Sequence, residues 1–262
     1  MLLTLMAAAS WQVCAQDPPA DSPASAVAPQ AGTGTPERDV SLKQLPANLL
    51  DDQKNIWLFP ARLKRRSVLV HTLAVVGATA LLVMTCDPEE GRAFRDTTEF
   101  RGFNHVFSTF NTSVGLLLPP ALFYGVGVIR RDAKAQKTAL FTVEAVADAE
   151  LVTTVMKDID RRLRPAVVPL HGNFSDTWFQ SGGDFWRGAG SFPSGHTIAA
   201  AAIATVAARR YGRDHRWVPY VAYGLTAVVA FSRLTLSAHF LSDVCVGGVL
   251  GYTISRYAVL HQ

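Results

Sequence analysis

Six long apolar segments constrain the fold of this chain more than any other feature. They cover residues 67–86, 113–129, 138–160, 194–210, 217–232 and 242–257. None of them sustains the alternation of apolar and polar residues that a half-buried strand needs, so each is expected to form a helix. The chain has 262 residues, 49% of them hydrophobic, which is enough to bury a large core. The sequence therefore predicts an all-α fold, a bundle with six main helices.

The N-terminal part of the chain has a different composition. Residues 1–15 are apolar and end in a small residue, which resembles a secretory signal peptide, although they contain no Lys or Arg. Residues 16–47 are rich in Pro and Ala and are expected to form a disordered linker, because they offer little apolar surface to bury. The folded domain is expected over 48–262. It begins with an amphipathic segment, 48–63, and includes a charged loop over 87–101.

The charge and cysteine content exclude several classes of ligand. Lys and Arg number 25 against 21 Asp and Glu, which suits a small anion or a lipid headgroup better than a nucleic acid. The sequence has no zinc-type Cys pairs and no Gly-rich nucleotide loop, so no metal or nucleotide cofactor is expected. The three cysteines (Cys14, Cys86 and Cys245) are widely separated and are expected to act as small hydrophobic residues.

One short stretch, Gly190 to Thr197, has the composition of an anion site. It reads Gly-Ser-Phe-Pro-Ser-Gly-His-Thr and leads directly into a run of alanines. The first N–H groups of a helix have no intrahelical partner and lie at the positive end of its dipole, so they bind anions. Ser194 and Gly195 would supply donors there, and His196 an imidazole. Taken alone, an ordinary helix cap made by Ser194 explains the stretch equally well.

A second motif places two cations two helical turns apart. Lys157 and Arg164 are separated by seven residues, so they share a face if the helix continues between them. Pro165 then disfavours helix at the preceding residue and turns the chain. The alternative is a basic cluster that only compensates the dipole at the end of a helix.

A third motif combines Arg233 with His239 and Asp243. A His and an Asp four residues apart on a helix share one face, where the carboxylate can accept a ring N–H and fix the tautomer. The alternative is an ordinary surface pair. Together, however, the three motifs supply cations, hydrogen-bond donors, two imidazoles and an orienting carboxylate. That set can hold a tetrahedral oxyanion, attack it and protonate its leaving group.

The three motifs resemble the signatures of a known family. Lys-x6-Arg-Pro, Pro-Ser-Gly-His and Ser-Arg-x5-His-x3-Asp occur in this order and at the spacings found in the type-2 phosphatidic-acid phosphatase and vanadium haloperoxidase superfamily. The resemblance covers about residues 65–260 and implies that superfamily's helical fold.

The resemblance also implies a role for each motif residue. His239 would be the nucleophile that forms a phosphohistidine, Asp243 would hold and activate it, and His196 would be the general acid. The phosphoryl oxygens would be bound by Lys157, Arg164, Ser194, Gly195 and Arg233. Guanidinium groups compensate phosphoryl charge by themselves, so no metal is implied.

The expected activity is hydrolysis of a phosphomonoester or pyrophosphate, with a lipid-linked substrate favoured. The aromatic loop from Trp178 to Trp186 offers apolar surface for a lipid chain beside the cations. A soluble periplasmic acid phosphatase of broad specificity is the alternative, because residues 190–197 also resemble the motif of the bacterial class A enzymes. A vanadium haloperoxidase and a non-catalytic membrane protein are further alternatives.

The distribution of basic residues favours a protein of the bacterial inner membrane. The motifs fall at helix ends that share one side of an up-and-down bundle, and three basic clusters fall on the other side. These clusters are Arg62, Lys64, Arg65 and Arg66; Arg130, Arg131, Lys134 and Lys137; and Arg209, Arg210, Arg213 and Arg216. The positive-inside rule then directs the site towards the periplasm. A soluble periplasmic or secreted domain is the alternative, because Glu144, Asp148 and Glu150 are costly in lipid.

Overall fold

The structure is a computed structural model that describes residues 38, 40–95, 97–169, 172–186 and 188–260. The helices are α1 (Leu45–Trp57), α2 (Phe59–Arg62), α3 (Arg66–Thr85), α4 (Asp87–Arg95), α5 (Arg101–Val106), α6 (Thr109–Arg130), α7 (Ala133–Asp160), α8 (Gly195–Tyr211), α9 (Val218–Thr235) and α10 (Leu241–Ile254). A 3-10 turn at Pro165–Val167 and a π-helical turn at Ser255–Val259 complete the list. Among the described residues there is no strand, so the fold is all-α, as predicted.

The six apolar segments correspond to α3 and to α6 through α10. The largest shifts are at the starts of α6 and α7, where polar caps extend the helices beyond their apolar parts. Ser108 accepts a hydrogen bond from the backbone N–H of Asn111, and Asp132 accepts one from the backbone N–H of Lys134 at 2.8 Å. Such caps satisfy N–H groups that lack an intrahelical partner, so they set where a helix begins.

The prediction of a charged loop over 87–101 is wrong for its first nine residues, which form α4. The sequence there is ordered by charge: Asp87, Glu89 and Glu90 lie in the first turn, and Arg92 and Arg95 in the last. This order opposes the helix dipole at both ends and stabilises a short, polar helix. A search for apolar periodicity does not detect such a helix.

The expected linker at 16–47 also ends earlier than predicted, because the fold includes its last residues. The expected signal peptide and the linker up to residue 37 lie outside the described residues. Val40 is buried, and Arg38 forms ion pairs with Asp52 of α1 at 2.9 Å and with Glu144 of α7 at 3.0 Å. These contacts fix Arg38 and Val40 to the helical bundle and give the buried Glu144 a cationic partner.

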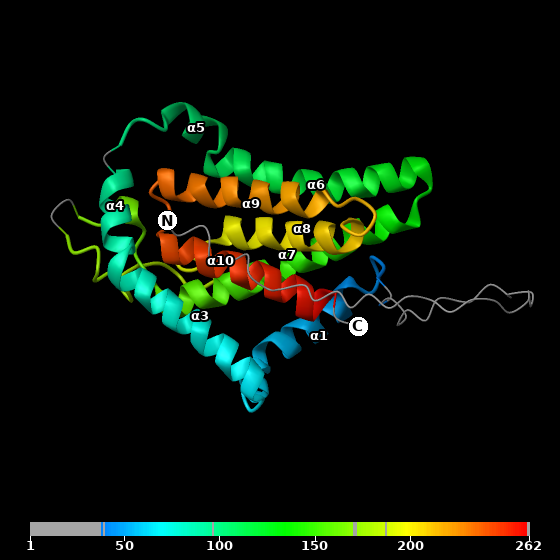
Figure 1. Cartoon of the computed structure of the whole chain (residues 1–262), viewed down its shortest axis with the longest axis horizontal. Coiled ribbons are helices and arrows are strands. Elements are labelled where there is room, and N and C mark those ends of the chain that lie inside the picture. Colours follow the sequence, from blue (N-terminus) through cyan, green and yellow to red (C-terminus); the bar gives the residue numbers. More distant parts are fainter. Residues whose placement is uncertain (1–37, 39, 96, 170–171, 187, 261–262) are drawn as a thin grey trace, which may run out of the picture. The chain divides into compact units, whose positions relative to one another are not determined.

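Helix α8 lies at the centre of the bundle, packed against α7, α9 and α10 (Figure 1). Its residues from Ile198 to Ala207 are buried, and most are alanines. Small side chains let helix backbones approach closely. On α10, a Cβ atom added at Gly251 would lie only 2.3 Å from the carbonyl oxygen of Ile198.

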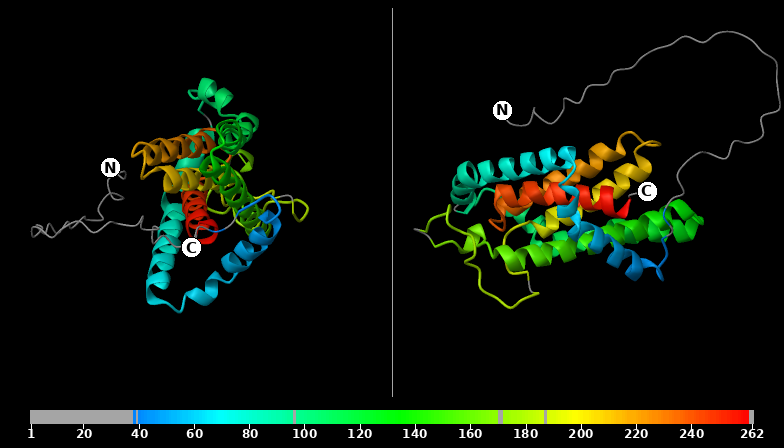
Figure 2. Two further views of the ribbon diagram at one scale, coloured as in Figure 1. Left: turned by 90° about the vertical axis from the view of Figure 1, so that its right-hand side faces the viewer. Right: turned by 90° about the horizontal axis from the view of Figure 1, so that it is seen from below.

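The ends of four helices meet on one side of the bundle. The end of α7, the start of α8, the end of α9 and the start of α10 lie together, with α4 beside them (Figure 1). At the opposite end, the α6–α7 and α8–α9 turns are joined by an ion pair between Lys134 and Asp214 at 2.6 Å. Helix α3 runs beside α10 (Figure 2) and buries none of its residues.

The contact between α8 and α10 predicts the effect of a single methyl group. Gly251→Ala places a Cβ against the backbone of Ile198, so we expect the free energy of unfolding to fall by about 1–3 kcal/mol. Gly248→Ala is the matched control, because its Cβ meets no atom within 4 Å. The midpoint of thermal unfolding of the purified protein measures both. Equal midpoints for the two variants would contradict the packing described.

Candidate active site

His239 lies in the turn between α9 and α10, and its side chain is 2% exposed. Its Nδ1 atom is 2.6 Å from the carbonyl oxygen of Ser191, which only accepts, so Nδ1 donates its proton there. Nε2 therefore carries the lone pair, and it lies 3.4 Å from Nη1 of Arg164, which only donates. Burial lowers the pKa of His239 to about 4. The imidazole is thus neutral at pH 7, with its lone pair on Nε2.

Asp243 is close to His239 but is not the direct acceptor of its proton. The distance from His239 Nδ1 to Asp243 Oδ2 is 3.6 Å, too long for the hydrogen bond that the spacing predicts. The prediction assumed a continuous helix, whereas α10 begins only at Leu241 and residue 239 lies outside it. Oδ2 instead accepts hydrogen bonds from the hydroxyl of Ser191 and from the backbone N–H of Phe240. Ser191 therefore stands between the two residues.

Arg164 and Arg233 bring two guanidinium groups to the site. Arg164 donates to the carbonyl oxygens of Ala238 at 3.2 Å and Gly190 at 3.4 Å. Arg233 is buried and donates to Thr112 Oγ1 at 2.9 Å and to the carbonyl of Phe107. Its Nη1 atom is buried without a hydrogen-bond partner among the described residues. A buried donor of this kind suits an anionic ligand, since an unpaired polar group is costly.

Lys157 lies in the last turn of α7. Burial, followed by the positive charge of Arg164, lowers the pKa of its amine to about 8. An amine whose protonation is disfavoured by a neighbouring cation is stabilised in its charged form by a bound anion. Lys157 and Arg164 do not lie on one continuous helix, because α7 ends at Asp160 and Arg161 takes a left-handed conformation at φ 44°. The chain itself turns Arg164 towards His239.

Ser194 is the N-cap residue of α8, as the sequence predicts, but its hydroxyl makes no capping bond. It accepts a hydrogen bond from Thr197 Oγ1 at 3.0 Å, and the backbone N–H of Ser194 donates to the carbonyl oxygen of Asp243 at 3.1 Å. The starts of α8 and α10 are therefore joined directly. Gly195 is the first residue of α8, so its N–H belongs to the donors at the positive end of the dipole.

His196, in the first turn of α8, is positioned by α6. Its Nε2 atom lies 3.0 Å from the hydroxyl of Ser113 and 3.3 Å from the carbonyl oxygen of Thr109. Burial, followed by the charge of Arg233, lowers the pKa of His196 to about 4. In the free protein at pH 7 this imidazole is neutral, whereas the expected role of general acid needs a proton on it.

Sequence reasoning missed a buried ionic cluster behind Asp243. Arg162 donates to Asp243 Oδ1 at 2.5 Å, to Asp87 Oδ2 at 2.6 Å and to Ser242 Oγ at 2.8 Å. The only signal in the sequence is the basic run that ends at Pro165. Asp87 gives no such signal, because it lies on the unpredicted helix α4.

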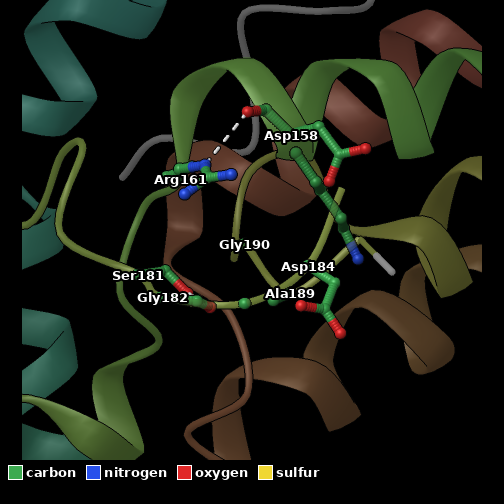
Figure 3. Close-up of a pocket in the computed structure, with 9 residues that line it drawn as sticks. Asp158, Arg161, Ser181, Gly182, Asp184, Ala189 and Gly190 are labelled. Atoms are coloured by element: carbon green, nitrogen blue, oxygen red, sulfur yellow. Dashed lines mark hydrogen bonds between the residues drawn. The ribbon is translucent and has the colours of Figure 1, made fainter. Parts of the chain in front are cut away.

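The aromatic loop before α8 leaves several side chains exposed. Phe179, Phe185 and Trp186 are exposed, and the backbone N–H of Trp186 donates to Asp158 Oδ2 at 2.7 Å. Under this loop, beside Lys157, is a pocket of about 10 Å³ lined by Asp158, Arg161 and residues 181–184 and 189–190 (Figure 3). It has room for a single water molecule. We therefore assign it no ligand.

A much larger apolar groove, of about 560 Å³, is lined by α6, α8 and α9. Its lining includes Phe107 and Thr112, which accept hydrogen bonds from Arg233, so the groove lies beside this cation. Alanines of α8, including Ala204, form part of its wall, and Gly115 of α6 faces it. Elsewhere in the described ranges, no three His, Cys, Asp or Glu side chains are grouped as a metal site requires.

Part of the chain matches a known protein family. Residues 138–261 match the family model of the PAP2 superfamily. This segment, a little under half of the chain, contains every predicted site residue. The resemblance seen in the three motifs is thereby confirmed.

Two individual proteins are similar to the chain. A lipid A 1-phosphatase of Porphyromonas gingivalis is 38% identical over 68 residues, which are 26% of this chain but only 15% of that protein's length. The crystal structure of a transmembrane PAP2-type phosphatidylglycerolphosphate phosphatase from Bacillus subtilis aligns with 82% of this chain and 94% of its own. The identity is 19% and the TM-score is 0.41.

The two lowered histidine pKa values predict a specific pH dependence. A phosphoryl dianion bound among the cations raises the pKa of His196, because it offsets the positive charges that lower it in the free protein. In a pH profile, the falling limb of kcat reports the pKa of the acid in the enzyme–substrate complex. The falling limb of kcat/KM reports its pKa in the free enzyme. We therefore expect the falling limb of kcat at a higher pH than that of kcat/KM, in a bell-shaped profile. A falling limb of kcat at the same or a lower pH would contradict His196 as the acid.

Proposed function

We propose that this chain is a phosphatase that hydrolyses a lipid-linked phosphomonoester or pyrophosphate through a phosphohistidine intermediate. The observation that carries the proposal is the neutral Nε2 of His239, which faces Arg164 while Nδ1–H is held by the carbonyl of Ser191. Lys157 and Arg233 add positive charge at the same site. Phosphoryl transfer needs chiefly a positioned nucleophile and charge compensation on the phosphoryl oxygens, and these groups supply both.

In the first step, Nε2 of His239 attacks phosphorus and the bond from phosphorus to the leaving oxygen breaks. His196 gives its proton to that oxygen. The ring of His239 becomes a cationic phosphoimidazolium, which the carbonyl of Ser191 and the nearby charge of Asp243 stabilise. In the second step, a water molecule attacks phosphorus while His196 takes its proton. Phosphate leaves, and His239 returns to its neutral form.

The phosphoryl oxygens bind to cations and to backbone donors in this scheme. Arg164 and Lys157 lie on the side of the nucleophile, and Arg233 presents the unpartnered Nη1. The N-terminal N–H groups of α8, beginning at Gly195 after the Ser194 cap, complete the site. Guanidinium groups favour this use because their planar donors match phosphoryl geometry.

The apolar groove favours a lipid substrate over a small water-soluble ester. Its lining includes Phe107, which accepts a hydrogen bond from Arg233, and residues of α6 and α9, so the chain of a lipid phosphate bound at the cations can lie in the groove. Burial of each CH2 group in such a groove contributes about 0.8 kcal/mol. The relative named as a lipid A 1-phosphatase also supports a lipid phosphate.

Two helices support a membrane location. Helices α3 and α6 are long and apolar enough to cross a bilayer, with mean hydropathies of 2.1 and 1.6. The sides of α3 and α6 expose leucine and valine, among them Leu73, Leu117 and Leu122. The basic turns between α6 and α7 and between α8 and α9 lie at the end opposite the site. By the positive-inside rule, this arrangement favours the inner membrane with the site towards the periplasm.

Phosphate release from lipid and soluble substrates tests the proposal. Wild type should hydrolyse long-chain lipid phosphates with a higher kcat/KM than p-nitrophenyl phosphate. Gly115→Leu fills the groove without a clash, because its Cβ meets no atom within 4 Å. It displaces about two CH2 groups of a lipid chain, so kcat/KM for the lipid should fall about 10-fold.

The control is Gly125→Leu, on the same helix, also without a neighbour within 4 Å and outside the groove lining. It should leave both substrates unaffected, and Gly115→Leu should spare the soluble ester. Equal effects of Gly115→Leu on lipid and soluble esters would overturn the lipid assignment. No phosphate release by wild type from any ester would overturn the phosphatase itself.

A further inference from the structure

Arg162 connects two carboxylates that lie on different helices. It is 1% exposed, and its guanidinium contacts Asp243 at the start of α10 and Asp87 at the start of α4 at 2.5 and 2.6 Å. Both carboxylates are fully buried. The rings of Phe240 and Trp178 lie 4.1 and 4.6 Å from its central carbon, so the guanidinium is fixed on its faces as well as its edges. Its hydrogen bonds go to these carboxylates and to the hydroxyls of Ser242 and Thr177, so it has no direct part in the proposed reaction.

The contacts of Asp243 extend from Arg162 to the nucleophile. Oδ1 binds Arg162, and Oδ2 accepts the hydroxyl proton of Ser191. The carbonyl oxygen of the same Ser191 accepts the Nδ1 proton of His239. A continuous series of buried polar contacts therefore runs from Arg162 through Asp243 and Ser191 to the ring that reacts.

Asp87 fixes the other end of this series. Its Oδ1 accepts the backbone N–H of Ser242 at 3.0 Å and its Oδ2 accepts the hydroxyl of Ser242 at 2.6 Å. Glu90, one turn later on α4, faces the same cluster, and burial followed by the charge of Asp87 raises its pKa to about 8. Glu90 is therefore neutral at pH 7, and the cluster holds two carboxylates against one guanidinium. Removing Arg162 would leave both carboxylates buried without their cation.

We propose that Arg162 and Asp87 are positioning residues for the nucleophile: they hold Asp243, and through it the Ser191 carbonyl, against His239. This inference rests on the proposed phosphatase function. It makes α4 part of the catalytic support, although no residue of α4 reaches the phosphoryl group. Arg162 also compensates the charge of Asp243, and so limits how strongly that carboxylate favours a protonated imidazole at His239.

The test compares Arg162→Met, Arg162→Lys and Asp87→Asn with wild type, using p-nitrophenyl phosphate and inhibition by orthovanadate. Arg162→Met should lower kcat roughly 10- to 100-fold, as loss of an outer partner of a reacting group does elsewhere. KM and the vanadate inhibition constant should stay within about threefold of wild type, because Arg162 does not touch the phosphoryl oxygens. The rising limb of kcat/KM should move to higher pH, since uncompensated Asp243 favours the imidazolium form of His239.

Two further variants keep the test independent of folding. Arg162→Lys retains the charge and should restore much of kcat and return the rising limb towards wild type. Asp87→Asn should lower kcat less than Arg162→Met, with KM unchanged. Arg92→Met, at an exposed position of α4, is the matched control and should behave as wild type, because among the described residues Arg92 lies over the ring of Phe174 and makes no hydrogen bond to the cluster.

The outcomes separate this inference from the function on which it rests. A wild type without activity would overturn the phosphatase, whereas an active wild type with normal kcat in Arg162→Met would overturn the positioning role alone. A loss of kcat that parallels a loss of vanadate binding, with an unmoved rising limb, would also overturn it, because that is the result of a purely structural role. If Arg162→Met does not fold, a normal kcat in both Arg162→Lys and Asp87→Asn decides against the inference.

Discussion

The close contact between α8 and α10 is the constraint on which the rest of the molecule depends. Alanines on α8 and Gly251 on α10 let the two backbones approach until Gly251 lies against the carbonyl of Ile198. The two helices consequently begin side by side, and the N–H of Ser194 donates to the carbonyl oxygen of Asp243. This contact brings the donors at the start of α8 next to the turn that carries His239. Bulkier residues at this contact would separate the two halves of the site.

Charge is divided between two layers around His239. On one side, Lys157, Arg164 and Arg233 provide positive charge, and Arg233 keeps a buried donor without a partner in the described chain. On the other side, Arg162 is already paired with two carboxylates. In the proposed mechanism the first three cations bind the ligand and the fourth supports the nucleophile, and only the geometry distinguishes them.

The sequence predicted the apolar helices well, because length and hydropathy are local properties of segments such as 67–86. It missed α4, since that helix is stabilised by charge order and by burial of Asp87 against Ser242, 155 residues later in the chain. The expected bond from His239 to Asp243 failed for a related reason: helical spacing has no meaning for a residue outside the helix. Ser191 and Arg162 became visible as partners only when the turns around them were placed in space. The motifs indicate the candidate reacting groups, and tertiary contacts determine how these groups are held.

The central claim is that Nε2 of His239 becomes covalently attached to phosphorus. Wild type mixed with a 32P-labelled lipid phosphate and quenched into alkaline detergent, in which phosphohistidine survives, measures this directly. The account predicts a base-stable, acid-labile label on His239 that forms no more slowly than turnover and disappears when unlabelled substrate is added. His239→Ala should carry no label, and the control His71→Ala on α3 should be labelled as wild type is. A turning-over enzyme that never carries the label, or label that persists in His239→Ala, would contradict the account.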